Sequence, residues 1–219
     1  MNPPDPDAIA AALAVHVHED DFVLPGRSNH IVAATLIPLQ WKGGLTAIAT
    51  VRTSHLRHHP GEVCFPGGTP DCPSEDTQTT AVREAAEELG IVAPRLLGRL
   101  SRMPVYTSEH RITPWVAAIS DAPLQPAPGE VAEVLRIPLL PLLTGSTIEG
   151  LPFPMPQGTG WSPLFHAGAH ILFGATAHSL FELLGVLAPL YGLRRPPLAK
   201  GQTEWSDVLP PEWAAGLPS

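Results

Sequence analysis

The sequence has little cysteine. Cys64 and Cys72 are the only two cysteines among 219 residues, and their spacing fits no zinc-binding pattern. Two cysteines also cannot supply the disulfide framework of a small secreted domain. We therefore expect reduced thiols, with Cys64 a small buried hydrophobe, and a cytoplasmic location.

Basic residues are also scarce. The formal net charge is -8 at pH 7, whereas a general nucleic-acid binder carries a basic footprint on its surface. The charge balance therefore excludes nucleic acid as a partner. It leaves an anionic small-molecule substrate open, because bound cations can reverse the sign of the charge inside a site.

No segment is apolar over the roughly 18 residues that a membrane-spanning helix needs. The most apolar stretch, residues 170–193, is interrupted by two histidines, Ser179 and Glu182. The N-terminus has early acidic residues and lacks the positively charged region of a signal peptide. We expect a soluble protein without a membrane partner.

Hydrophobic residues make up 44% of the chain, enough for one sizeable core. We expect a single domain over residues 1–193, with a short N-terminal helix at Ala8–His16, a core at about 30–144 and a late helix at about 170–191. The proline-rich tail at 194–219 predicts a loose arm.

Two β-branched apolar runs, His30–Gln40 and Leu45–Thr53, flank the turn sequence Trp-Lys-Gly-Gly and predict a hairpin. A third short strand at Val63–Phe65 stops at Pro66-Gly67-Gly68. A helix is expected from about Asp76 to Leu89, with Gly90 ending it. The remaining expected elements are strands near 96–103 and 112–119, a strand and helical turn at 130–144, and a long loop at 151–163. Strands that pair on both sides of a central helix indicate an α/β or α+β sandwich.

The helix at Asp76–Leu89 gathers three glutamates. At about 100° per residue, Glu84, Glu87 and Glu88 share one outward face. The opposite, packing face is formed by Val82, Ala85, Ala86 and Leu89. Like charges at this spacing destabilise a helix, and the helix dipole disfavours negative charge at the C-terminal end. Either this is a solvated charged face, or it binds a hard divalent cation such as magnesium or manganese.

Two neighbouring features favour the metal site. Gly68 lies where a strand turns into a loop, so its carbonyl oxygen can approach a metal without interference from a Cβ. Arg83 follows Glu75 by eight positions. An arginine–glutamate pair there would clamp the loop onto the helix rather than perform chemistry.

The segment from Gly68 to Ile91 resembles the signature of the Nudix hydrolases, which cleave nucleoside diphosphates linked to another moiety. Seven residues separate Glu75 from the run Arg83-Glu84-Ala85-Ala86-Glu87-Glu88-Leu89-Gly90-Ile91. This run matches the second half of the signature apart from the small Ala85. Six residues rather than five separate Gly68 from Glu75. The resemblance implies an α/β/α sandwich with a mixed central sheet, and Mg²⁺ or Mn²⁺ held by Gly68, Glu84, Glu87 and Glu88.

The residues before this signature resemble the coenzyme A pyrophosphatase branch of the family. The matching positions are Leu56, Arg57, His59, Gly61, Val63, Phe65, Pro66, Gly67 and Gly68. Residues 129–139 and 173–184 resemble later segments of that branch, with Phe173 in place of the usual tryptophan. The resemblance implies cleavage of coenzyme A or acyl-coenzyme A into 3′,5′-ADP and 4′-phosphopantetheine.

Hydrolysis of a phosphoanhydride needs metals that neutralise it and acidify a bound water, and a carboxylate that takes the proton. Glu84, Glu130 and Glu133 are the candidates for this base. Arg52 and Arg57 suit the phosphates, because arginine supplies a bidentate donor fork. Arg57 and His59 could instead only order their loop. Arg102 and Arg111 are a second candidate set.

Two alternatives stay open at this point. One is a different Nudix substrate, such as ADP-ribose, NADH or a dinucleoside polyphosphate. The other is a non-catalytic nucleotide-binding domain, against which the intact Arg83-Glu84 and Glu87-Glu88 pairs argue. The sequence leaves the oligomeric state open, a homodimer included.

Overall fold

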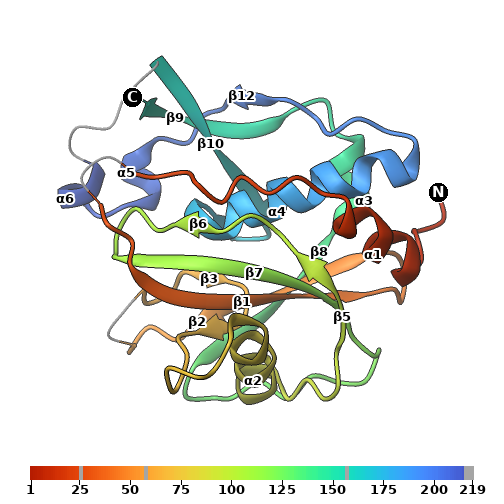
Figure 1. Ribbon diagram of the computed structural model, residues 1–219. Coiled ribbons are helices and arrows are strands. Elements are labelled where there is room, and N and C mark those ends of the chain that lie inside the picture. The colour runs from red at the N-terminus through yellow and green to blue at the C-terminus, as the bar shows by residue number, and fades with distance from the viewer. Residues whose placement is uncertain (25–26, 57–58, 156–157, 215–219) are drawn as a thin grey trace.

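The computed structural model describes residues 1–24, 27–56, 59–155 and 158–214 (Figure 1). Its larger sheet has eight strands: β1 Ile31–Gln40, β2 Thr46–Arg52, β3 Val63–Cys64, β4 Gly67–Gly68, β5 Arg95–Arg99, β6 Met103–Pro104, β7 His110–Ala118 and β8 Val131–Pro138. Strand β1 pairs antiparallel with β2 and β4 and parallel with β7. The sheet is therefore mixed, as predicted.

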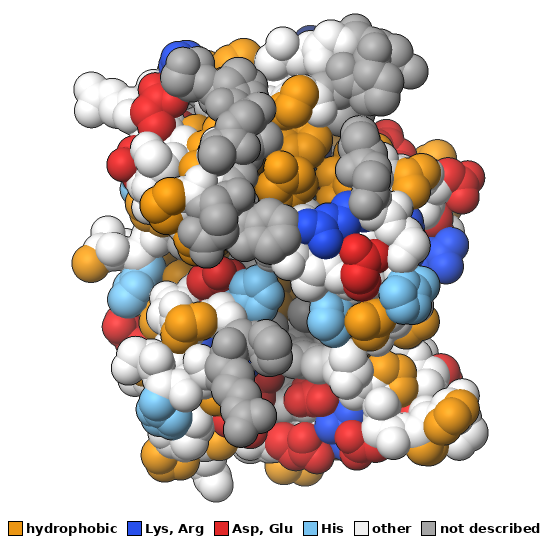
Figure 2. Space-filling view, turned by 90° about the vertical axis from the view of Figure 1, so that its left-hand side faces the viewer, with side chains coloured by type: hydrophobic (Ala, Val, Ile, Leu, Met, Phe, Trp, Pro, Cys, Tyr) orange, Lys and Arg blue, Asp and Glu red, His pale blue; other side chains and the backbone are white. Residues whose placement is uncertain are grey.

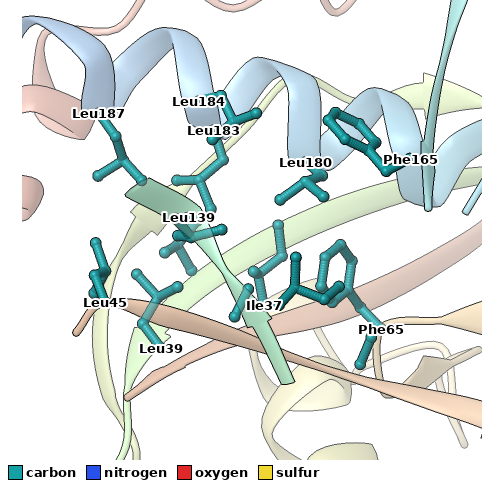
Figure 3. Close-up of a cluster of buried hydrophobic side chains, with 14 of the residues drawn as sticks. Ile37, Leu39, Leu45, Phe65, Leu139, Phe165, Leu180, Leu183, Leu184 and Leu187 are labelled. Carbon is teal, nitrogen blue, oxygen red and sulfur yellow. The ribbon is translucent and has the colours of Figure 1, made fainter. Parts of the chain in front are cut away.

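The central strands point alternate side chains into two hydrophobic layers. Leu36 of β1 and Ile48 of β2 belong to the cluster packed against α2 (Thr77–Leu89). Ile37 and Leu39 belong to the cluster on the other face, which is covered by α4 (Gly174–Leu187) and α1 (Pro6–Ala14) (Figure 3). This period-two division between helices confirms the α/β/α sandwich.

Helix α2 begins and ends on local signals. The Asp76 carboxylate accepts a hydrogen bond from the Thr79 N–H at 2.8 Å, and Gly90 takes the left-handed conformation, with φ 66°, that ends a helix. Helix α2 packs mainly on β1 and β4. Its glutamates are thereby placed next to the turn that follows β3.

The predicted long loop at 151–163 is wrong. This segment lies in a second sheet formed by β9 Ile148–Met155, β10 Gly158–Ala167, β11 His170–Leu172 and β12 Leu198–Lys200. Pro152, Pro154 and Pro163 all fall in the same alternating set of β9–β10 pairs. In an antiparallel ladder that set directs its N–H groups away from the partner strand, so prolines do not break the pairing.

The late helix is shorter than predicted, because His170–Leu172 forms β11 and Ala188–Tyr191 is a 3₁₀ turn. The predicted loose arm is also wrong for the described residues. Strand β12 pairs with β9, and α5 (Trp205–Val208) places the Trp205 indole N–H 2.6 Å from the Pro152 carbonyl oxygen. Short helices α3 (Leu139–Thr144) and α6 (Pro211–Ala214) complete the described chain. Across these residues, no helix has the length and apolarity that crossing a bilayer requires.

Candidate active site

The three glutamates of α2 lie at different depths. Glu88 is 3% exposed, whereas the Glu84 side chain is 16% and the Glu87 side chain 58% exposed. The prediction of one shared outward face is therefore wrong for Glu88. The helix packs through Ala81, Ala85, Glu88 and Leu89, and Ala86 is exposed.

Glu88 points under the turn that contains β4. Its Oε1 accepts a hydrogen bond from the Gly67 N–H at 3.0 Å. Burial raises the pKa of Glu88 to about 7, with the charges of Glu84 and Glu130 adding to the rise and the Gly67 hydrogen bond opposing it. The site therefore holds a carboxylate whose charge the protein alone stabilises poorly.

Gly68 lies directly against Glu84. A Cβ on Gly68 would overlap the Glu84 carboxylate, so only glycine allows the backbone and this side chain to approach so closely. Burial raises the pKa of Glu84, although Arg83 opposes the shift. The structure thus brings together two of the predicted metal ligands.

Arg83 connects the loop after β4 to the acidic helix. Its Nε lies 2.9 Å from Glu75 Oε1, and one terminal nitrogen donates to the Thr69 carbonyl oxygen at 3.0 Å. The other terminal nitrogen lies 3.0 Å from both Glu84 Oε1 and Glu87 Oε2. The arginine–glutamate pair expected from the spacing is present, and the same guanidinium is the counter-ion of two further carboxylates.

The donor set fits a hard divalent cation. The Glu84 carboxylate lies against Gly68 and the Glu88 carboxylate against the Gly67 N–H, with Glu87 on the same helix, and carboxylate and carbonyl oxygens suit Mg²⁺ or Mn²⁺. In the described part of the chain, no three acidic, histidine or cysteine side chains are already gathered at metal-binding distance. Arg83, which now spans Glu84 and Glu87, would have to release them for a metal to bind.

The two downstream acids differ in position. The charge of Glu130 raises the pKa of both Glu84 and Glu88, which places it at this site. The Glu133 carboxylate contacts the His170 ring at 2.9 Å on the second sheet. The charge effects on Glu84 and Glu88, together with the engagement of Glu133 by His170, favour Glu130 over Glu133 as a neighbour of the acidic helix.

Arg52 and His59 line the same cleft as Gly67 and Gly68. The positive charge of Arg52 acts on the titration of Glu88. His59 has a positive φ of 54° and contacts Glu62 at 2.9 Å, and this hydrogen bond raises the pKa of His59. Arg57 lies outside the described residues.

The cleft has a volume of about 1470 Å³ and reaches from β3 and β4 to the second sheet. Its lining includes a group of aromatic residues that the sequence motifs do not single out: Tyr106, Phe153, Phe173 and Trp205. Figure 2 shows this side of the molecule, with acidic side chains gathered in its lower part, hydrophobic ones in its upper part and histidines between.

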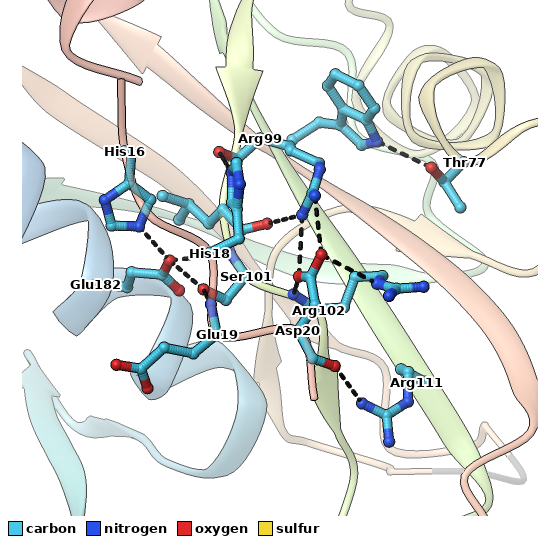
Figure 4. Close-up of polar contacts among 12 residues, drawn as sticks. His16, His18, Glu19, Asp20, Thr77, Arg99, Ser101, Arg102, Arg111 and Glu182 are labelled. Atoms are coloured by element: carbon cyan, nitrogen blue, oxygen red, sulfur yellow. Dashed lines mark hydrogen bonds and ion pairs between the residues drawn. The ribbon is translucent and has the colours of Figure 1, made fainter. Parts of the chain in front are cut away.

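Hydrogen bonds and ion pairs hold the N-terminal segment before β1 in place beside this cleft (Figure 4). Arg99 donates to the Asp20 carboxylate at 3.0 and 2.8 Å, and the Arg102 N–H donates at 2.7 Å. Burial raises the pKa of Asp20, but these hydrogen bonds outweigh it and hold the pKa at about 2. Arg111 donates to the Asp20 and Phe22 carbonyl oxygens. Arg102 and Arg111, the second candidate phosphate set, are therefore engaged with this segment.

Known proteins provide an independent comparison. Residues 29–147 match the NUDIX domain family. The chain is 38% identical over 184 residues to the mouse mitochondrial coenzyme A diphosphatase NUDT8, covering 79% of this chain and 85% of that protein. It is 39% identical over 110 residues to the mouse peroxisomal coenzyme A diphosphatase NUDT7, covering 48% of this chain and 46% of that protein. A Caenorhabditis elegans Ap4A hydrolase complex is 19% identical, with a TM-score of 0.42, covering 51% of this chain and 82% of that one. From the signature on α2, the family match and the relation to NUDT8, the chain belongs to the Nudix hydrolases.

Proposed function

We propose that this Nudix hydrolase cleaves the pyrophosphate of coenzyme A or an acyl-coenzyme A, giving 3′,5′-ADP and (acyl-)4′-phosphopantetheine. The observation that carries the proposal is the similarity to a coenzyme A diphosphatase across 79% of the chain, acidic helix included. The segment before the helix, with its Leu56, His59, Gly61 and Phe65-Pro-Gly-Gly residues, supports the same substrate.

Nudix hydrolases generally need a divalent metal. Here Glu84, Glu87, Glu88 and the Gly68 backbone would hold Mg²⁺ or Mn²⁺. When bound, the metal neutralises the diphosphate and acidifies a water molecule. The protein itself fixes the ligands: Arg83 and Glu75 hold the loop onto α2, and the Gly67 N–H orients Glu88.

The proton of the attacking water needs a carboxylate acceptor. Glu84 and Glu130 are the candidates that we propose, because the charge of Glu130 contributes to the raised pKa of Glu84. Arg52 and His59 line the cleft beside them and supply positive charge for the phosphates. A cytoplasmic location is a proposal only, because the names of the two mouse relatives give mitochondria and peroxisomes instead.

A substrate panel tests the proposal. Coenzyme A, its 3′-dephospho form, ADP-ribose, NADH and a dinucleoside polyphosphate are compared with Mg²⁺ or Mn²⁺, and the products are identified by mass. A charge-assisted contact to the 3′-phosphate contributes roughly 1.5–3 kcal/mol, so coenzyme A should exceed its dephospho form by about 10- to 150-fold in kcat/KM.

Arg52→Ala and Arg57→Ala should each remove part of that preference. If the wild-type protein treats the two forms alike, or prefers ADP-ribose, the coenzyme A assignment is wrong while the Nudix assignment stands.

A further inference from the structure

The segment His59-Pro60-Gly61-Glu62 forms a β-turn that contributes to the lining of the cleft. Proline at the second position of a turn and a glycine with positive φ at the third, here 74° at Gly61, are typical of a type II turn. The Glu62 N–H donates to the His59 carbonyl oxygen at 3.3 Å, which closes the turn. The turn therefore brings the side chains of its first and last residues next to each other.

Backbone hydrogen bonds hold this turn in place. The Gly61 N–H donates to the Arg52 carbonyl oxygen at 3.2 Å, and the Arg52 N–H donates to the Glu62 carbonyl oxygen at 3.0 Å. These bonds continue the pairing of β2 with β3. Because the turn has its own backbone bonds, ordering of the loop does not account for the contact between the His59 and Glu62 side chains.

The Glu62 carboxylate lies in the cleft that we propose to bind phosphates, although its negative charge would repel them. Its Oε2 lies 2.9 Å from His59 Nδ1, and the Glu62 and His59 side chains are 36% and 37% exposed. This hydrogen bond raises the pKa of His59, against the opposing effects of burial and of the Arg52 charge. Glu62 therefore stabilises a positive charge on the neighbouring ring.

The other ring nitrogen of His59 is left for a ligand. With Nδ1 directed to Glu62, Nε2 is the nitrogen through which a protonated imidazole can donate to a bound group. Among the described residues, the charges that act on His59 are those of Glu62 and Arg52, and the Arg52 charge also acts on Glu88. The imidazole and the Arg52 guanidinium thus share the part of the cleft beside the acidic helix.

We propose that Glu62 is a positioning residue, which holds the His59 imidazole in its charged form and leaves Nε2 to donate to a phosphate of the substrate. The proposal rests on the proposed function. Glu62 acts only through His59, because a direct contact between its carboxylate and a phosphate would be repulsive. Without Glu62, His59 would lose its proton at a lower pH and would offer the phosphate a weaker, neutral hydrogen bond.

The pH dependence of Glu62→Gln tests this role. Glutamine keeps an oxygen that can accept from Nδ1 but has no charge. The ratio of kcat/KM between Glu62→Gln and wild type, measured with coenzyme A, should be close to one near pH 5.5, where His59 is charged in both proteins. Above the usual histidine pKa of about 6.5 the ratio should fall at least about fivefold, because the variant loses its imidazolium first. Protonation of Glu88 affects both proteins alike and cancels in this ratio.

A double-variant cycle separates positioning from direct action. His59→Gln should lower kcat/KM, and adding Glu62→Gln should cause no further loss. His166→Gln is the matched control, because His166 pairs with Glu149 at 2.8 Å and is not among the described residues that line the cleft. This control should keep the wild-type kcat/KM. Additive losses from the two cleft substitutions, or a ratio that does not change with pH, would overturn the proposal.

A comparison with 3′-dephospho-coenzyme A shows which phosphate His59 contacts. If the loss in Glu62→Gln is confined to coenzyme A, the contact is with the 3′-phosphate. An equal loss with both substrates assigns the contact to the diphosphate.

Nuclear magnetic resonance titration of the His59 ring in the metal-free protein needs no hydrolysis. The His59 signal, identified by its absence in His59→Gln, should titrate at a lower pH in Glu62→Gln than in wild type, and 3′,5′-ADP should raise the wild-type pKa further. If both shifts are found in a protein that does not cleave coenzyme A, the proposed function is wrong and the role of Glu62 stands. An unchanged His59 titration in Glu62→Gln would refute that role whatever the substrate.

Discussion

Glu88 is a buried residue whose carboxyl group is ordinarily charged at neutral pH. Its raised pKa means that the folded protein binds the Glu88 proton more tightly than the unfolded chain does. This contribution to stability is fully present below the unfolded pKa of 4.5 and is lost as the pH rises through about 7. A salt-bridged glutamate, whose pKa is lowered, has the opposite pH dependence: its contribution to stability is lost as the pH falls.

We therefore expect the metal-free protein to lose up to about 3 kcal/mol of stability between pH 5 and pH 8 from this residue alone. Glu88→Gln should flatten that slope and melt higher than wild type at pH 8. Thermal melts in EDTA measure both effects, with the exposed Glu87→Gln as control. Parallel slopes in wild type and Glu88→Gln would contradict the burial argument.

Removal of Arg83 should have the opposite effect on stability, because it leaves the carboxylates around Arg83 without their partner. Arg83→Ala should lower both the melting temperature and the turnover, because Glu75 loses its bidentate partner and the loop after β4 is released from α2. Arg83→Lys should restore little, because an ammonium cannot replace the fork. A variant that melts like wild type but is inactive would assign the arginine to the substrate instead.

At the scale of elements, the two glycines of β4 are each needed for a different close contact. A Cβ on Gly67 would overlap the Ala34 carbonyl oxygen and the Thr35 Cα on β1, whereas a Cβ on Gly68 would overlap only the Glu84 carboxylate. One glycine serves the pairing of β4 with β1, and the other serves the acidic site.

Gly67→Ala should therefore destabilise the fold by roughly 2 kcal/mol or more, because backbone atoms must move. Gly68→Ala should leave the melting temperature nearly unchanged and lower kcat at least about tenfold, because a flexible side chain is displaced from the site. Melting curves and turnover of the pair decide this. Comparable melting temperatures for both variants would show that β4 tolerates the extra atom.

Local signals explain which elements are predictable. Helix α2 has an Asp76 cap, a Gly90 terminator and a period-3.6 apolar face, all within its own residues. The β9–β10 hairpin has no such signal: its prolines resemble a loop, and its pairing with residues 198–200 depends on a distant segment. The burial of Glu88 could not be predicted from the sequence either, because the periodicity of α2 does not show that β4 covers this residue.

At the scale of the molecule, the proposed metal site predicts a dependence on a divalent cation, because Glu84 and Glu88 both have raised pKa values in its absence. EDTA should abolish turnover, and back-titration with Mg²⁺ or Mn²⁺ should restore it. Metal at about 100 times its Kd should stabilise the fold by about 2.7 kcal/mol, and by more at pH 8 than at pH 6, where protonated Glu88 competes. Unchanged turnover in EDTA would return the cluster to a solvated charged face.

Strand β12 pairs with β9 in the second sheet, and Trp205 packs against Phe153, both from the last part of the described chain. Because synthesis proceeds from the N-terminus, a nascent chain holds the full mixed sheet and the acidic helix once β8 has emerged, well before residue 205 is made. The acidic helix and the second sheet are thus completed in succession. Substitutions in residues 198–209 can therefore change the second sheet and the part of the cleft beside Trp205 without altering a residue of the acidic helix or of β4.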